Sequence, residues 1–227
     1  MLGRESELQR LLAKMRKDWD TRARKNALFH VNSAQPDWTD EEFFRTGEIN
    51  IAEQILNDMR NVCQGADPKQ MRVLEIGCGA GRLTRSLAKL FGEVHAVDIS
   101  PEMIALAKKK LAGVPNVFIY ANNGLDLAPL PDVPFDFAFS FIVFHHIPSR
   151  EVIASYLREV HRLLRPGALF KFQVKGRCDR QAKTDDTWFG LALSPEDISA
   201  LAEECGFECR HRLGAGTQYF WIWFFKK

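Results

Sequence analysis

The sequence predicts an α/β protein built on a doubly wound, mostly parallel sheet of seven strands, with the last strand antiparallel. Between residues 71 and 174, short apolar runs alternate with amphipathic helical stretches. Strands that alternate with helices need crossover connections, which make neighbouring strands parallel. Near the C-terminus, two further apolar runs are joined by Gly214 to Thr217 alone. A connection that short permits only an antiparallel pair.

Composition restricts the class of protein. The chain has 227 residues, of which 46% are hydrophobic, enough for one substantial core. Its net charge of +2 shows no excess that would favour nucleic acid or an anionic membrane as the partner. No signal-peptide core or membrane-length apolar stretch is found, and the five cysteines form no CxxC pair. We therefore expect a cytoplasmic protein with reduced thiols.

The N-terminal region is predicted to be a helical cap over residues 1–65, part of the same domain as residues 66–227. An apolar stripe at helical spacing predicts an amphipathic helix; its residues are Leu8, Leu11, Leu12, Met15 and Trp19. This helix is expected to dock on the body of the protein or on a second subunit, with membrane or RNA binding as the alternatives. A mixed segment over 32–47 precedes a helix expected at 48–60.

The remaining elements follow in order. Strands are expected at 71–76, 93–98, 116–120, 135–143, 168–174, 207–213 and 218–225, and helices at 82–91, 100–113, 149–164 and 194–206. Ser100-Pro101-Glu102 supplies an N-cap, a proline at the first helical position and an acid in the first turn, and Ser194 begins the same pattern again. A turn at 165–167 is expected before the fifth strand.

The most informative segment is a strand that runs through Gly77, Gly79 and Gly81 into a helix. Glycines permit positive φ and close backbone approach, and we expect them to leave unpaired amides at the helix N-terminus to face a ligand. A phosphate-binding P-loop would need Lys-Ser or Lys-Thr after the last glycine, where Arg82 and Leu83 stand. The NAD or FAD fingerprint would need glycine at position 82, and Glu75 would lie unfavourably near a pyrophosphate.

Two acids favour S-adenosylmethionine instead. Glu75 suits a ligand that carries an amino group and a sulfonium near the loop. Asp98 ends the second strand at the same sheet edge, where its carboxylate can accept two hydrogen bonds from a ribose diol. The alternative is structural: Glu75 can satisfy loop amides, and Asp98 can cap the helix near Ser100.

These motifs resemble those of the class I S-adenosylmethionine-dependent methyltransferases. The resemblance rests on Glu-x-Gly-x-Gly-x-Gly followed by an aspartate at the end of strand two, and it covers roughly residues 71–175. Further matches occur at 121–127, 135–140 and 163–169. The family's last strand inserts antiparallel between its neighbours, which agrees with the short final connection.

The resemblance implies a set of cofactor-binding residues. Asp98 would hold the ribose hydroxyls, and Ile99 would pack on the adenine. Glu75 and the loop would hold the methionine part, with loop residues Gly77, Cys78, Gly79 and Gly81. Asn123, followed by Gly124, stands where the family commonly has an aspartate that accepts from the adenine amino group, and an amide oxygen can also accept there.

His145 and His146 follow the fourth strand, at the edge where ligands of open α/β sheets bind. Either histidine can act as a base or shape the acceptor pocket, or can be a packed structural residue. No Asn-Pro-Pro-Tyr motif follows this strand, which disfavours methylation of adenine-like nitrogens. No aspartate ends it, so we expect no metal.

The leading hypothesis is methyl transfer from S-adenosylmethionine to a small-molecule acceptor by a monomer or homodimer. The alternatives are an RNA or protein methyltransferase and a non-catalytic cofactor-binding subunit. Residues 175–193 are interpreted as a lid or as a surface excursion. Trp19 can belong to a cap over the methionine end or to ordinary helix packing, and the aromatic residues at 219–225 are interpreted as core.

Overall fold

The computed structural model describes residues 2–177 and 185–227, and it divides the chain into two compact units, Met1–Gly124 and Leu125–Lys227. The first unit holds three strands and the N-terminal helices. The second unit holds four strands and the histidine pair.

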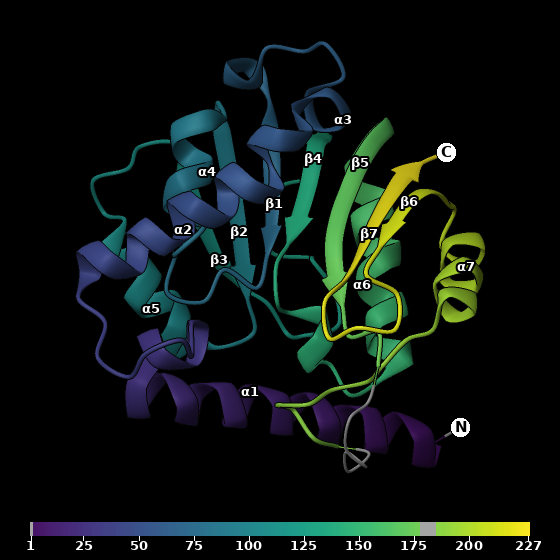
Figure 1. Cartoon of the computed structure of the whole chain (residues 1–227). Helices are drawn as coiled ribbons and strands as arrows, with labels where there is room; N and C mark the ends of the chain where they lie inside the picture. Colours follow the sequence, from purple (N-terminus) through teal and green to yellow (C-terminus); the bar gives the residue numbers. More distant parts are fainter. Residues whose placement is uncertain (1, 178–184) are drawn as a thin grey trace. The chain divides into compact units, whose positions relative to one another are not determined.

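In the first unit, strands β1, β2 and β3 form a parallel run in which β2 pairs with both neighbours. Figure 1 shows these strands with their carboxyl ends pointing the same way. The helices and strands of this unit are α1 (Leu2–Val31), α2 (Asp40–Gln54), η1 (Leu56–Asp58), α3 (Met59–Cys63), η2 (Pro68–Gln70), β1 (Arg72–Ile76), α4 (Thr84–Leu90), β2 (Glu93–Asp98), α5 (Pro101–Lys110) and β3 (Val117–Ala121).

In the second unit, β4 and β5 are parallel, and β7 lies antiparallel between β5 and β6. Its elements are β4 (Phe135–Ser140), η3 (Phe144–His146), α6 (Arg150–Leu163), β5 (Leu164–Val174), α7 (Pro195–Glu204), β6 (Phe207–Leu213) and β7 (Phe220–Lys226). The predicted fold class is confirmed: the strands belong to a mostly parallel seven-stranded sheet, with the last strand inserted antiparallel.

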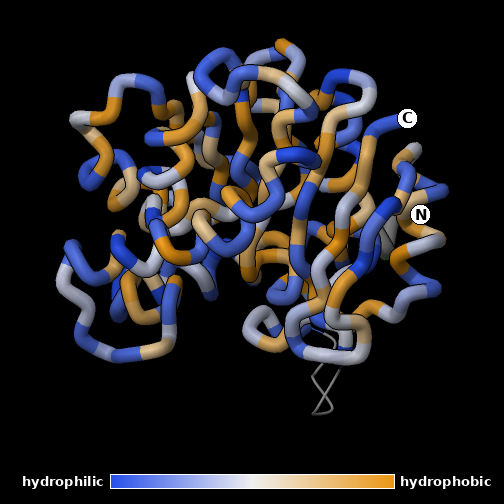
Figure 2. The backbone as a smooth tube through the Cα atoms, turned by 45° about the horizontal axis from the view of Figure 1, so that its top comes forward, coloured by the Kyte–Doolittle hydropathy of each residue, from blue (hydrophilic) through white to orange (hydrophobic). Residues whose placement is uncertain are grey.

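The apolar residues gather along the strands, whereas the outer turns are hydrophilic (Figure 2). In the second unit, the strands bury large aromatic side chains. Phe170 and Phe172 stack with ring centroids 4.5 Å apart, and Phe144 packs against both of them. Phe220 and Phe224 of β7 are fully buried, which confirms the interpretation of most of that aromatic segment as core. The exceptions are Tyr219, whose side chain is 48% exposed, and Trp223, which is partly exposed.

The amphipathic N-terminal helix is confirmed and is longer than its apolar stripe predicted. Helix α1 covers 30 residues and bends at Asn26, whose backbone is extended (φ −168°, ψ 89°). It buries Leu12 and Met15 from the stripe, and it contributes Ala23 and Ala27 to an apolar cluster of the first unit. Neither α1 nor any other helix within the described residues has the length and hydropathy that crossing a membrane requires.

The helix predicted at 48–60 has different bounds. Helix α2 begins at Asp40 and ends at Gln54. Its start is fixed by Thr39, whose hydroxyl accepts from the Glu42 amide while the Glu42 carboxylate accepts from the Thr39 amide, a reciprocal capping box. This signature lies inside the segment interpreted as mixed, and the apolar pair that follows it, Phe43 and Phe44, is buried.

Two strand boundaries also differ from the prediction. Strand β4 ends at Ser140 rather than at residue 143, because Ile142 adopts a left-handed conformation (φ 57°) that a strand cannot continue. Strand β5 begins at Leu164, so the predicted turn at 165–167 lies within it. Gly167 has a φ of 76°, and the register with β4 shifts in this region, as at a bulge.

Candidate functional site

Glu75 is a buried carboxyl group near the carboxyl end of β1. Its side chain is 2% exposed, and its Oε2 accepts a hydrogen bond of 2.6 Å from the Thr84 hydroxyl. Burial raises the pKa of Glu75 to about 7, with the charge of Asp98 adding to the shift and the Thr84 hydrogen bond and Arg82 opposing it. An arriving cation would favour the ionised form and relieve this penalty.

Arg82 is the buried cation beside Glu75. Its guanidinium donates to Asn50 Oδ1 at 2.6 Å and to Thr46 Oγ1 at 3.2 Å, both on α2. Burial lowers the pKa of Arg82 to about 10, while Glu75 opposes the shift. A Cβ at Gly47 would lie 2.2 Å from the Arg82 carbonyl oxygen, so a glycine is what lets α2 approach the loop this closely.

The three alternate glycines adopt positive φ, as predicted: 76° at Gly77, 51° at Gly79 and 86° at Gly81. Two of them are also in tight contact with neighbouring helices. A Cβ at Gly79 would lie 2.7 Å from Val31 at the end of α1, and a Cβ at Gly81 would lie 2.8 Å from Leu111 just after α5. A larger residue at either position would require the contacting side chain or its helix to shift.

The expectation that the loop amides are unpaired is wrong for four of them. The amides of Gly77 and Cys78 donate to the Val97 carbonyl, at 2.8 and 3.0 Å. The Gly79 amide donates to Asp98 Oδ2, and the Gly81 amide donates to the Cys78 carbonyl. The end of β2 lies alongside the loop and accepts hydrogen bonds from three of these amides, and α4 begins only at Thr84.

Asp98 is held at the end of β2 by two backbone amides. Its Oδ2 accepts from Gly79 and its Oδ1 from Ser100, both at 2.9 Å. Burial raises the pKa of Asp98 to about 6; the charge of Asp20 adds to this, and the amide hydrogen bonds oppose it. Helix α5 is capped by the Ser100 hydroxyl. A carboxylate offers about four lone-pair directions, so two of them stay available for a diol.

Ile99 and Gly124 lie against each other beside Asp98. A Cβ at Gly124 would approach Ile99 Cδ1 to 2.5 Å, and the φ of Gly124 is 83°. Asn123, the neighbour of Gly124, is exposed. The Cys78 side chain belongs to a different environment, because it is buried in an apolar cluster with Ala96 and Ile104, so Cys78 offers the site its backbone and not its thiol.

Helix α1 runs across the carboxyl ends of these strands (Figure 1). Asp20 Oδ1 accepts from the Ser100 hydroxyl at 2.5 Å and from the Glu102 amide at 3.3 Å. Arg16 donates to the Asn122 carbonyl at 3.3 Å. Leu12 lies 3.3 Å from where a Cβ at Gly124 would stand.

Asp20, Arg16 and Thr84 therefore belong to the candidate site. The sequence resemblance placed Asp20 within the 19–23 segment that could form a cap over the methionine end, but gave its carboxylate no role. Arg16 and Thr84 were not predicted, and no local pattern marks Arg16. The position of Thr84 could have indicated a role, because it is the first residue of the helix that directly follows the glycine loop. The partly buried Trp19 packs against the apolar cluster of the first unit, as in ordinary helix packing.

In the second unit, His145 and His146 form a buried pair in η3, immediately after β4. Their Nε2 atoms lie 3.2 Å apart, and His146 Nδ1 lies 2.6 Å from the Trp188 carbonyl oxygen. A carbonyl only accepts, so His146 Nδ1 carries the proton, and Nε2 of the neutral ring accepts from His145 Nε2–H. The neutral His145 ring then has its lone pair on Nδ1.

His145 Nδ1 has no hydrogen-bond partner among the described residues, although the side chain is only 6% exposed. Burial, with a contribution from the charge of Lys175, lowers the pKa of His145 to about 4. His145 is therefore neutral at physiological pH. Within residues 2–177 and 185–227, no cluster of three or more His, Cys, Asp or Glu residues could hold a metal ion.

Part of the predicted lid, residues 178–184, lies outside the described residues. The described remainder contacts the turn that holds the histidine pair, because the Leu191 amide donates to the Ile147 carbonyl. Within the segment, Lys175 Nζ donates to the Phe189 carbonyl. A Cβ at Gly190 would lie 2.3 Å from the His145 carbonyl oxygen, so this segment contacts the histidine turn directly.

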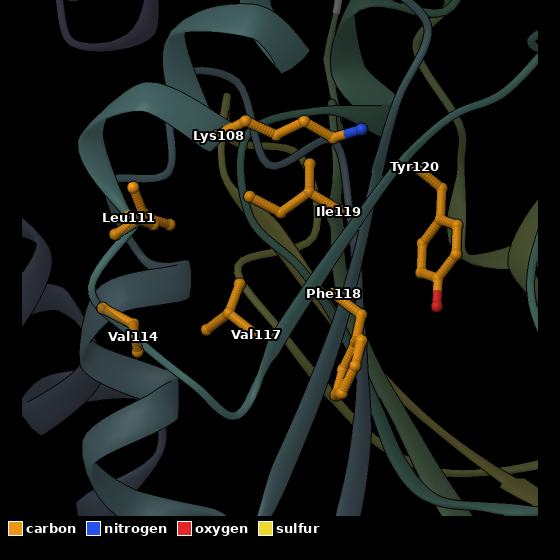
Figure 3. A pocket seen from close by; sticks show the side chains of 8 residues that line it. Lys108, Leu111, Val114, Val117, Phe118, Ile119 and Tyr120 are labelled. Carbon is orange, nitrogen blue, oxygen red and sulfur yellow. The ribbon is translucent and has the colours of Figure 1, made fainter.

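A hollow of about 340 Å³ lies between the end of α5 and β3, and Figure 3 shows its lining side chains. The lining includes Lys108, Phe118 and Tyr120. The predicted site residues are not among those that line it: the glycine loop and the acids lie elsewhere in the first unit, and the histidine pair lies in the second.

Comparisons with known proteins agree with this geometry. Residues 74–172 match a family model described as a methyltransferase domain. A probable S-adenosylmethionine-dependent methyltransferase from Mycolicibacterium smegmatis is 28% identical, over 76% of this chain and 62% of that protein. A demethylmenaquinone methyltransferase from Staphylococcus aureus is 31% identical, over 61% of this chain and 68% of that protein. The chain thus spans just over three fifths of the length of the first relative.

A solved structure shares the fold. Magnesium protoporphyrin IX methyltransferase from Synechocystis PCC 6803, crystallised with bound S-adenosylhomocysteine, superposes with a TM-score of 0.68 over 95% of this chain and 99% of that one, at 16% identity. Family match, relatives and fold agree with the glycine loop and the acid that ends β2. The chain belongs to the class I S-adenosylmethionine-dependent methyltransferases.

Proposed function

We propose that the chain transfers a methyl group from S-adenosylmethionine to a small-molecule acceptor. The observation that carries this proposal is the convergence of three carboxyl groups, Asp20, Glu75 and Asp98, around the glycine loop. The charge of Asp20 contributes to the raised pKa of Asp98, and the charge of Asp98 contributes to the raised pKa of Glu75. A negative site built from glycines and acids suits an organic cation with a diol.

The residues present fit this cofactor. Asp98 would accept from the ribose hydroxyls through its remaining lone pairs, and Glu75 would attract the methionine amino group. Ile99 and Gly124 would contact the adenine, with Asn123 accepting from its amino group. Backbone of Gly77, Cys78, Gly79 and Gly81 would approach the methionine part closely. S-adenosylmethionine, when bound, supplies an electrophilic methyl group on a sulfonium.

The chain's contribution to the reaction is alignment, exclusion of water and the handling of one proton. Helix α1, which crosses the ends of the three strands, would exclude water from the cofactor. His145 Nδ1 would accept the proton that the acceptor loses, while His146 and the Trp188 carbonyl hold the ring in the required tautomer. The low pKa of His145 makes it a weak base, so positioning matters as much as basicity.

The proposal also covers the class of methyl acceptor, the location of the enzyme in the cell and its oligomeric state. The Staphylococcus aureus relative is named for methylation of demethylmenaquinone, which supports a small molecule as the acceptor. We further propose a cytoplasmic monomer or homodimer without a nucleic-acid partner or a metal, on the support of its near-neutral charge and its cysteine pattern. Residues 1–65 would serve as the helical cap of the 66–227 domain.

The test is methyl transfer itself. The purified chain is incubated with S-adenosylmethionine that carries a labelled methyl group and with fractionated cell extract, and the label is followed into small molecules, RNA and protein. Label in the small-molecule fraction, absent with Asp98→Ala, is expected. Label found only in RNA or protein would replace the proposal by the corresponding alternative, and cofactor binding without any transfer would favour a non-catalytic subunit.

A further inference from the structure

Two buried hydrogen-bond acceptors of the second unit have no partner among the described residues. They are His145 Nδ1 and Gln173 Oε1. The side chains are 6% and 2% exposed, respectively. Buried polar atoms are almost always hydrogen-bonded, because an unpaired one keeps its desolvation penalty. A bound molecule that brings hydrogen-bond donors would satisfy both atoms.

The two atoms belong to one aromatic surface. Gln173 of β5 stands directly opposite Trp221 of β7, and opposite residues of an antiparallel pair project from the same face. The Trp221 ring stacks on Phe141 at 5.5 Å, with 29° between the planes. The His145 ring stacks on Tyr219 at 6.2 Å, two residues before Trp221. We call these five residues, Phe141, His145, Gln173, Tyr219 and Trp221, the acceptor cluster.

The chemistry of the missing partner follows from the cluster. The neutral, buried His145 can only accept at Nδ1, because His146 already fixes the proton on Nε2. An amide oxygen likewise only accepts. The ligand must therefore bring two hydrogen-bond donors. Lys175 acts on His145 with its positive charge, which disfavours ammonium donors. Among uncharged donors we choose hydroxyl groups, because a hydroxyl group loses a proton to His145 more readily than an amide or amine N–H does.

The shape of the missing partner follows from the aromatic side chains. Phe141, Tyr219 and Trp221 present flat apolar surfaces that favour a stacked or edge-on ring. We propose that the acceptor cluster binds the methyl acceptor, and that this acceptor is a planar aromatic molecule with two hydroxyl groups. This inference rests on the proposed function and specifies its substrate class.

A matched ligand series tests the inference without turnover. 2,3-Dihydroxynaphthalene carries two donors, 3-methoxy-2-naphthol one, and 2,3-dimethoxynaphthalene none. Their binding to the full chain is measured by ligand-observed NMR titration in the absence of cofactor. We expect the affinity to fall about tenfold for each donor lost, the usual effect of leaving a buried acceptor unpaired.

Variants then identify the two acceptors. Gln173→Met keeps the length of the side chain without its amide and should lower the affinity for the diol about tenfold, with no change for the dimethoxy compound. His145→Phe should have the same selective effect. The matched control is Gln70→Met, at an exposed glutamine at the end of η2, which should leave the whole series unchanged.

Equal affinity for the diol and the dimethoxy compound in the wild-type chain would overturn the inference, and so would a Gln173→Met variant that still discriminates between them. Buried water would then be the partner of both atoms. Binding of S-adenosylhomocysteine is measured on the same samples. If it binds while the diol series shows no discrimination, the substrate class is wrong and the proposed function stands.

Discussion

The buried titratable groups of the two units differ in the direction of their pKa shifts and in their hydrogen bonding. In the first unit, Glu75 and Asp98 have raised pKa values, about 7 and about 6, and both accept hydrogen bonds from the protein. In the second unit, His145 has a lowered pKa of about 4, and its Nδ1 has no partner among the described residues.

This difference teaches what each unit is prepared to recognise. The free-energy cost of burying an acid falls when a cation or a hydroxyl donor binds next to it, because both stabilise the carboxylate. The cost of burying a neutral imidazole with an unpaired lone pair falls when a neutral hydrogen-bond donor binds to it. This difference supports the proposal that the first unit binds the charged cofactor and the second an uncharged hydroxyl of the methyl acceptor.

The largest expected effect is at Asp98. Replacing it by alanine would remove the two charge-assisted hydrogen bonds that we propose it makes to the ribose, which should cost roughly 2 to 4 kcal/mol, or about 30- to 1000-fold in cofactor affinity. Isothermal titration with S-adenosylhomocysteine measures this loss. The control is Asp136→Ala, which removes a carboxylate paired with Arg165 in the second unit. A loss below about fivefold would mean that the ribose assignment is wrong.

The second largest expected effect is a loss of turnover, without a loss of cofactor affinity, when the histidines of the second unit are replaced. His145→Ala should lower turnover about 100-fold, at the low end for loss of a general base because its pKa is low, and should change cofactor affinity less than about twofold. His146→Ala should also lower turnover more than cofactor affinity. Steady-state kinetics with the identified acceptor measures both, and His211→Ala on the exposed part of β6 is the control. Unchanged turnover in both variants would remove the catalytic role.

The third prediction compares how Glu75 affects binding of the methionine end and of the adenosine end of the cofactor. Glu75→Gln should weaken S-adenosylhomocysteine binding about tenfold, because the carboxylate no longer attracts the amino group. Adenosine keeps the ribose and the adenine but lacks the amino acid part, so its affinity should stay within about twofold. Equal losses for both ligands would show that Glu75 supports the loop as a whole and does not recognise the methionine end.

The last prediction concerns the pH dependence of stability, where the two units have opposite signs. The folded state binds the extra proton at Glu75, so this group's contribution to stability falls as the pH rises from about 4.5 to about 7. At His145 the unfolded state binds the extra proton, so its contribution falls as the pH drops from about 6.5 to about 4. Each slope is at most about 1.4 kcal/mol per pH unit.

Urea unfolding of wild type, Glu75→Gln and His145→Phe at pH 5.0 and 6.5 checks these signs. The stability difference between wild type and His145→Phe should favour wild type less at pH 5.0 than at pH 6.5, and the difference for Glu75→Gln should move in the opposite direction. A difference that is the same at both pH values would show that the group is not buried in the folded state as described.

Local signals predicted most of the fold. Strands β1 and β2 lie within a residue of their predicted bounds, and Ser100 and Ser194 cap the helices expected after them. Hydrophobic period and capping chemistry act over a few residues, so they can be recognised directly in the sequence. The start of α2 shows the limit of that reasoning, because the capping box at Thr39 was available and was overlooked.

The candidate site was predictable only in part, for a physical reason. The glycine loop and the acids at positions 75 and 98 share one sheet edge, so their positions along the chain already indicate a common ligand. Asp20 contacts Ser100 across 80 positions of sequence, and Gln173 meets Trp221 through strand pairing. Such contacts depend on tertiary packing, which period and propensity do not contain.

The most direct test of the account is whether the wild-type chain binds the cofactor product. Thermal unfolding is recorded with S-adenosylhomocysteine at about a hundred times its dissociation constant, where binding to one site adds roughly 2.7 kcal/mol and should raise the melting temperature by roughly 5 to 10 °C. That gain, with one site per chain by titration calorimetry, is predicted. No shift and no binding heat would contradict the claim that the loop after β1 and the acid that ends β2 hold an adenosyl ligand.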